Sequence, residues 1–157
     1  MGHQLTRQDI QKMEEEIEYR KLVERPKLIA AVKEAREQGD LSENFEYYAA
    51  KREKNRNESR IRYLDRIIRT AEIIEDTSAE NEIGIGDLVD LYFEEEQVTE
   101  TFCVVTTVGA DALNNMVSIE SPIGKAILGK QEGDRVNVEV GRDNHFYVEI
   151  KKIRKNS

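Results

Sequence analysis

Apolar residues recur every three or four positions from Thr6 onward, which is the period of an amphipathic helix. Pro26 interrupts this run because it lacks an amide donor, so we expect the helix to bend or divide there. Gly39 then offers a stop, since glycine adopts the left-handed conformation that ends many helices. The pattern predicts one helical arm whose apolar positions are Ile10, Met13, Ile17, Leu22, Ile29, Val32 and Ala35.

A second helix is predicted from about Ser42 to Glu75. Its apolar stripe has alternating steps of four and three, the spacing of a coiled-coil seam. The short connection at 39–44 favours antiparallel pairing with the first helix. Arms of roughly 30 residues would carry this turn about 45 Å from their base. The predicted seam is Asn57, Ile61, Leu64, Ile68 and Ala71.

Apolar and polar residues alternate from Ile85 onward, with turn signals between the runs, so this half is predicted to form a small, mostly antiparallel sheet. The segment 121–129 instead reads as a short helix with a serine cap, a proline in its first turn and a glycine at its end. We therefore predict an α+β protein. Its parts are a coiled-coil hairpin at 1–76, a polar linker at 77–84 and a β-rich domain at 85–157.

The charge is divided unevenly along the chain. The net charge is −8, and the excess of acid lies after residue 75, whereas residues 51–69 carry eight basic against three acidic side chains. An acidic protein with one basic stripe suits selective contact with phosphates better than general coating of DNA, which would need a basic face throughout. Cys103 is the only cysteine, which excludes an internal disulfide and cysteine-rich zinc sites. With no apolar stretch of spanning length, we expect a cytoplasmic protein that does not bind membranes.

The predicted turn holds the sharpest candidate chemistry. Asp40, Glu43 and Glu46 are spaced by three, so their carboxylates could project together and share a Mg²⁺ ion. Such a site would be incomplete alone and would serve a two-metal reaction if a partner supplied the second ion. The alternative is helix capping, with Asp40 as the cap and Glu43 as its reciprocal partner. Both could hold if Ser42 builds the cap.

Basic and aromatic side chains flank the turn. Arginine and lysine could hold phosphates while tyrosines stack on unpaired bases, the common division of labour at single-stranded ends. The alternative is a solvated helix face with ion pairs between successive turns. The candidates are Arg36, Lys51, Arg52, Lys54, Arg56 and Arg60, with Tyr47 and Tyr48 among them.

Three segments together resemble the bacterial Gre transcript-cleavage factors, and GreA more than GreB. They are ERPKLIAAVKEAREQGDLSENFEYYAAK at 24–51, YLDRIIRTAEII at 63–74 and SIESPIGKAILGKQEGDRVNVEV at 118–140. The resemblance implies that the hairpin enters the secondary channel of RNA polymerase while an FKBP-like C-terminal domain sits at the channel rim. It also implies that the polymerase, not this chain, cuts the backtracked RNA.

The resemblance assigns roles by position. Asp40 and Glu43 would organise the second Mg²⁺ and its water, with tip support from Asn44, Glu46 and Tyr47. The 3′ end of backtracked RNA would meet Arg36, Lys51 and Arg52, and the rim would meet Ser121, Pro122 and Ile123. Lys51 stands where arginine is common, which keeps the charge and loses the planar fork. Phe45 and Tyr48 are bulkier than expected there.

Two further hypotheses remain beside cleavage stimulation. A Gre-like protein could occupy the channel and inhibit polymerase without promoting cleavage. A coiled-coil adaptor could use Asp40 only as a cap. We expect a monomer that holds no tightly bound metal and has no nuclease activity of its own.

Overall fold

The computed structural model describes residues 2–39 and 44–156. They form two compact units, one of helices and one built on a sheet, as the α+β prediction requires. The first unit takes in 7–71, and the second takes in 4–6 with everything from 72 onward. The strand and linker residues before 85 therefore belong with the sheet unit, whereas the sequence placed the hairpin boundary at 76.

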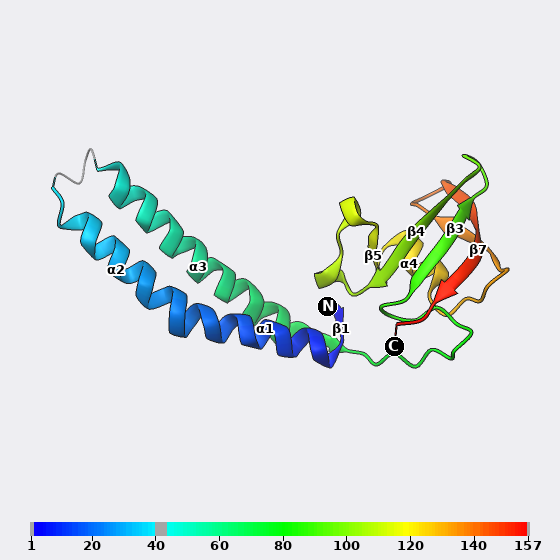
Figure 1. Cartoon of the computed structure of the whole chain (residues 1–157), viewed down its shortest axis with the longest axis horizontal. Helices are drawn as coiled ribbons and strands as arrows, with labels where there is room; N and C mark the ends of the chain where they lie inside the picture. The colour runs from blue at the N-terminus through cyan, green and yellow to red at the C-terminus, as the bar shows by residue number, and fades with distance from the viewer. Residues whose placement is uncertain (1, 40–43, 157) are drawn as a thin grey trace. The chain divides into compact units, whose positions relative to one another are not determined.

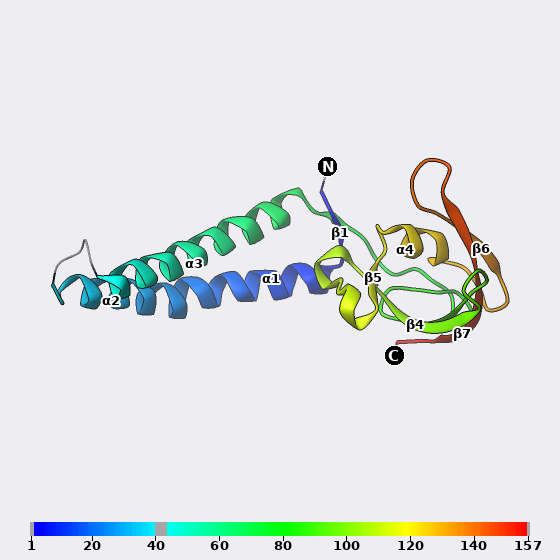
Figure 2. The ribbon, with the colours of Figure 1, turned by 90° about the horizontal axis from the view of Figure 1, so that it is seen from above.

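The helical unit is an antiparallel hairpin. One arm contains α1 (Arg7–Tyr19), the π-helix η1 (Arg20–Glu24) and α2 (Arg25–Arg36), and the other is α3 (Phe45–Thr70). Both views show the arms lying alongside one another (Figure 1, Figure 2). At 1.5 Å per residue α3 alone is about 39 Å long. The predicted hairpin is confirmed.

The interruption at Pro26 takes the form of a π-helical turn. In an α-helix the proline ring would clash with the carbonyl four residues earlier. Here the hydrogen bonding widens by one residue before the proline, and the amide of Arg25 donates to the carbonyl of Arg20. The helical path continues into α2 directly, so the proline changes the winding of the arm without dividing it by a loop.

A buried polar contact joins the arms at this turn. Asn57 of α3 is only 4% exposed. Its side-chain amide donates to the Arg20 carbonyl oxygen at 3.3 Å, and its own oxygen accepts from the Arg20 guanidinium at 3.0 Å. Because a buried amide must be hydrogen-bonded, this pair fixes which turn of α3 lies against the π-helix.

The seam of α3 consists of Asn57, Ile61, Leu64 and Ile67. The predicted seam was wrong at its last positions, because Ile68 and Ala71 are only half-buried. Ion pairs flank the seam. Arg25 binds Glu58 through two hydrogen bonds of 2.9 and 2.8 Å, and Glu16 accepts from both Arg60 and Arg20. The bond from Arg60, partly offset by burial, lowers the pKa of the Glu16 carboxyl.

Helix α3 ends at Thr70, earlier than the predicted Glu75. The following residues extend into β2 (Glu72–Ile73), which pairs in parallel with β1 (Gln4–Leu5). Leu5, in this strand pair, is fully buried. A tertiary contact with the N-terminal segment therefore overrides the helical preference of the sequence after residue 70, and neither strand was predicted.

The second unit is a five-stranded sheet in the order β5-β4-β3-β7-β6. All neighbours are antiparallel except β4 and β5, which are parallel. The predicted strands all form. They are β3 (Leu88–Phe93), β4 (Val98–Val105), β5 (Met116–Ser118), β6 (Arg135–Glu139) and β7 (His145–Arg154).

The apolar face of this sheet carries a continuous core. Short helix α4 (Pro122–Ile127) packs on β5 and β6 and completes the core with Ile127. Gly124 lies so close to the Ser118 carbonyl that any side chain there would collide with it. The fully buried core residues are Ile83, Val89, Leu91, Val104, Ile127, Val138, Val148 and Ile150. In the described parts of the chain, no helix combines the length and apolar content needed to cross a membrane.

A buried carboxylate ties the end of the chain to this unit. Asp87 is 1% exposed and accepts hydrogen bonds from the amides of Gly84 at 2.7 Å and Asn156 at 2.8 Å. The Lys155 ammonium lies 2.8 Å from it. Burial opposes ionisation of Asp87, but Lys155 and the two amides together hold its pKa below the usual range.

Replacing the buried amide tests the contact between the arms. Asn57→Ala should lower the unfolding free energy by about 1–3 kcal/mol, since it removes hydrogen bonds and leaves a buried gap. Asn55→Ala is the matched control, because Asn55 is exposed on the same helix. Urea unfolding, followed by circular dichroism, measures the unfolding free energy of both variants. Equal midpoints for the two variants would show that Asn57 does not stabilise the hairpin.

The lowered pKa of Asp87 sets the acid sensitivity of the sheet unit. The ionised group contributes stability that is complete above its ordinary pKa of about 3.9 and is lost as pH falls through the lowered folded value. Asp87→Asn should therefore lower stability at neutral pH and flatten its decline below about pH 4. Asp143→Asn, at an exposed turn, is the control. If melting temperatures fall equally below about pH 4 in both variants, the prediction is contradicted.

Candidate functional site at the hairpin tip

The described ends of the arms approach the predicted tip from both sides. Helix α2 ends at Arg36, and Gly39 follows with φ of 133°, a value that residues with side chains rarely adopt. Helix α3 begins at Phe45 with Asn44 as its cap. Asp40 and Glu43, the predicted metal-organising pair, lie outside the described residues.

Asn44 closes the hairpin by bonding to both arms. Its side-chain oxygen accepts from the amide of Tyr47 at 3.0 Å, which caps α3. Its side-chain nitrogen donates to the carbonyl of Ala35 at 2.7 Å, in the last turn of α2. The capping alternatives named for Asp40 and Ser42 lie outside the described residues, and the residue that caps α3 in the structure is Asn44. With Asn44 as the cap, α3 needs no capping carboxylate from Asp40.

Aromatic and basic side chains pack around this closure. The Arg36 guanidinium lies over the Tyr47 ring, 5.7 Å from its centre, and joins α2 to α3. Tyr47 meets Tyr48 edge to face at 5.3 Å. Phe45 is 86% exposed beside them. The tip therefore combines a cation held over a ring with aromatic surface that faces solvent.

The predicted phosphate-binding residues are exposed on the first turns of α3. Lys51 and Arg52 both face solvent, and no ion pair within the described residues occupies either. Arg56 is paired with Glu53 at 2.8 Å, and Arg60 with Glu16 at 2.9 Å. The basic stripe is thus divided. Its members nearest the tip are free to meet an anion, and some members further along the helix are neutralised.

Of the three carboxylates predicted to share a metal ion, only Glu46 lies among the described residues. Within 2–39 and 44–156, no group of three His, Cys, Asp or Glu side chains could hold a metal. Glu46 is exposed in the first turn of α3, where the helix dipole favours a carboxylate. Two further carboxylates from Asp40 and Glu43 would give few protein ligands, which fits Mg²⁺ because it keeps water and phosphate oxygens in its shell.

The second predicted contact segment begins α4 of the sheet unit. The Ser121 hydroxyl accepts from the amide of Gly124 at 3.1 Å and donates to the Ser118 carbonyl at 2.6 Å. Ile123 packs against the core, whereas Pro122 is exposed. Ser121 and Ile123 thus hold the turn, and Pro122 is the side chain that it presents to solvent.

Comparison with known proteins matches both units. The family described as transcription elongation factor, N-terminal, matches 3–73, and the one described as transcription elongation factor, GreA/GreB, C-term, matches 78–155. The chain belongs to the GreA/GreB family of transcription elongation factors. It is 43% identical to transcription elongation factor GreA of Streptococcus gordonii, over 96% of this chain and 94% of that one.

Other relatives have the same extent. GreA of Acholeplasma laidlawii is 40% identical over 96% of both chains. Among solved structures, the GreA factor homolog 1 (Gfh1) protein of Thermus thermophilus is 27% identical, covering 99% of this chain and all of that one, with a TM-score of 0.46. The two family matches and the GreA relatives confirm, over both units, the family resemblance predicted from the sequence.

Sequence reasoning missed the bridging function of Asn44 in this GreA/GreB family member. Asparagine caps helices as well as serine does, so the residue type was a usable signal. The bond to Ala35 was not predictable, because it depends on how closely the arms approach. The contact of Asn57 with the π-helix was missed for the same reason.

Two substitutions separate the cap, which is the bond from the Tyr47 amide, from the bridge, which is the bond to the Ala35 carbonyl. Asn44→Ala should remove both and lower hairpin stability by about 1–2 kcal/mol, with faster amide exchange in the first turn of α3. Asn44→Asp should keep the cap but turn a donor into an acceptor facing the Ala35 carbonyl. We expect it to recover exchange protection at Tyr47 and not in the last turn of α2. Equal protection of both arms in Asn44→Ala and the unmodified protein would contradict this account.

Proposed function

We propose that this protein binds RNA polymerase through the secondary channel and stimulates the polymerase's own cleavage of backtracked RNA. The observation that carries the proposal is the closure of the hairpin by Asn44. A closed pair of long helices can present Asp40 and Glu43 at the end of a stiff element. A narrow, elongated probe is the shape needed to reach an active site through a channel.

The proposed work of the tip is electrostatic. Mg²⁺, when bound, activates a water and neutralises charge on the phosphodiester. Asp40 and Glu43 would hold this ion, with the remaining ligands supplied by the polymerase and the RNA. Their carboxylates would also orient water and accept hydrogen bonds from it. Because the ion is shared, the isolated protein should neither bind Mg²⁺ tightly nor cut RNA, and it is not an enzyme by itself.

The side chains around the tip would position the RNA. Lys51 and Arg52 are exposed and can bind phosphates of the displaced 3′ segment. Arg36 is held over Tyr47, so its charge is already oriented before RNA arrives. In the sheet unit, Pro122 with Ser121 and Ile123 would meet the channel rim. These contacts would raise affinity without touching the scissile bond.

Cleavage by a stalled, backtracked polymerase complex tests this function. Asp40→Asn and Glu43→Gln should each slow stimulated cleavage at saturating factor on the order of a hundredfold, as loss of one electrostatic contact does in other active sites. Glu37→Gln, an exposed acid after α2, is the control and should leave the rate unchanged. Polymerase affinity should stay the same in all three variants.

Other outcomes would overturn the proposal. Full cleavage with Asp40→Asn would mean that the tip acids are not used. Binding and inhibition by the unmodified protein, with no cleavage at any Mg²⁺ concentration, would instead identify a channel inhibitor. No binding to polymerase would favour an adaptor.

A further inference from the structure

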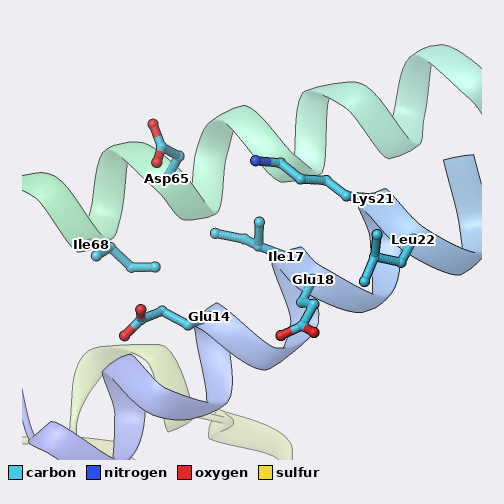
Figure 3. A pocket seen from close by; sticks show the side chains of 7 residues that line it. All are labelled: Glu14, Ile17, Glu18, Lys21, Leu22, Asp65 and Ile68. Atoms are coloured by element: carbon cyan, nitrogen blue, oxygen red, sulfur yellow. The ribbon is translucent and has the colours of Figure 1, made fainter.

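An open groove of about 380 Å³ lies on the hairpin away from its tip. It runs between α1 and the C-terminal half of α3 (Figure 3). Asp65, on its α3 side, follows Phe45 by twenty residues of continuous helix, which is about 30 Å along the axis. The groove is therefore separate from the residues proposed to act on RNA. Its lining is Glu14, Ile17, Glu18, Lys21, Leu22, Asp65 and Ile68.

The floor of the groove is aliphatic and open to solvent. Ile17 and Ile68 point toward one another across it (Figure 3). Because Ile67 takes the seam position, Ile68 is left half-buried at the groove. Leu22, at the π-helix, is 67% exposed. Three aliphatic side chains thus line one open surface that α1, η1 and α3 do not close, and this surface could accept an aliphatic side chain of a partner.

The rim of the groove is acidic. Glu14 and Glu18 are exposed and have no ion-pair partner among the described residues. They stand four residues apart on α1, a like-charge arrangement that destabilises a helix. Asp65 adds a third carboxylate, already paired with Arg69 at 3.2 Å, and Lys21 is the only cation of the lining. Two unpaired carboxylates beside an apolar floor repel phosphate and attract a cationic protein segment.

We propose that this groove binds a basic segment of the polymerase surface, one that inserts an aliphatic side chain between Ile17 and Ile68 and places Lys or Arg against Glu14 and Glu18. The inference rests on the proposed function, since it names how the polymerase would hold the base of the hairpin. The groove would provide a second attachment some 30 Å from the tip. Because both contacts are on one molecule, binding at one raises the effective concentration at the other, and the protein binds polymerase more tightly than through either contact alone.

Two variants that change the charge of α1 by the same amount test the acidic rim. The double variant Glu14→Gln/Glu18→Gln and the single variant Glu15→Lys both add two units of charge to α1. Only the first alters the groove, because Glu15 is exposed outside its lining. We expect the Kd for core polymerase to rise about tenfold in the double variant and to change less than twofold in Glu15→Lys. Raising the salt concentration should weaken polymerase binding by the unmodified protein more than binding by the double variant.

A second pair tests the apolar floor. Leu22→Ser should raise Kd several-fold, whereas Val23→Ser, exposed next to it and outside the groove, should not. Each altered side chain is exposed, so every variant should still unfold cooperatively in thermal melts, and the double variant, relieved of the repulsion between Glu14 and Glu18, should melt no lower than the unmodified protein. The cleavage rate at saturating factor should be unchanged in every variant, which separates affinity from the chemistry at the tip.

Three results would overturn the groove proposal. One is an equal Kd for the Glu14/Glu18 double variant and Glu15→Lys. Another is a dimer in sedimentation that the groove variants dissolve, because the occupant would then be a second copy of the chain. The third is no binding of the unmodified protein to polymerase, which would overturn the proposed function as well. Binding without cleavage would overturn only the cleavage proposal. The comparison of Kd values would still show whether the groove binds polymerase.

Discussion

The hairpin depends on the closure of two long helices at one end, where, among the described residues, Asn44 hydrogen-bonds to both arms. A helix terminus leaves several backbone groups without partners, and two facing termini double the problem. Asn44 satisfies one group on each arm, the amide of Tyr47 and the carbonyl of Ala35. Because Asn44 is hydrogen-bonded to both helices, it holds the end of α2 next to the start of α3. The two arms therefore end together as one stiff element.

The register of the arms is fixed at a second point. Asn57 bonds to Arg20 where the π-helix precedes Pro26, and apolar residues of α3 fill the seam on its C-terminal side. The proline, the widened turn and the buried amide therefore act together. The cost is a seam that does not close completely near the base, where Ile17 and Ile68 stay accessible. The seam that joins the arms therefore leaves the groove open.

Periodicity predicted the hairpin and the five strands because both patterns are local. Positions that depend on close tertiary contact were not predictable. Ile67 and Ile68 are equally apolar, and only the winding of the arms decides which one is buried. Residues 72–73 form a strand because Gln4–Leu5 lies beside them, a contact that no window of sequence reveals. At the candidate site, the residue types came from the sequence, while the cap at Asn44 and the ring contact of Arg36 came from the structure.

In the proposed function, a closed helical hairpin would deliver two carboxylates to a metal site that belongs to another molecule. The most direct measurement is a cryo-electron-microscopy structure of this protein bound to a backtracked polymerase complex with Mg²⁺. We expect the hairpin within the secondary channel, with the carboxylates of Asp40 and Glu43 bound to the second ion or to its water. A complex in which the hairpin lies outside the channel, or in which basic residues alone reach the active site, would contradict it.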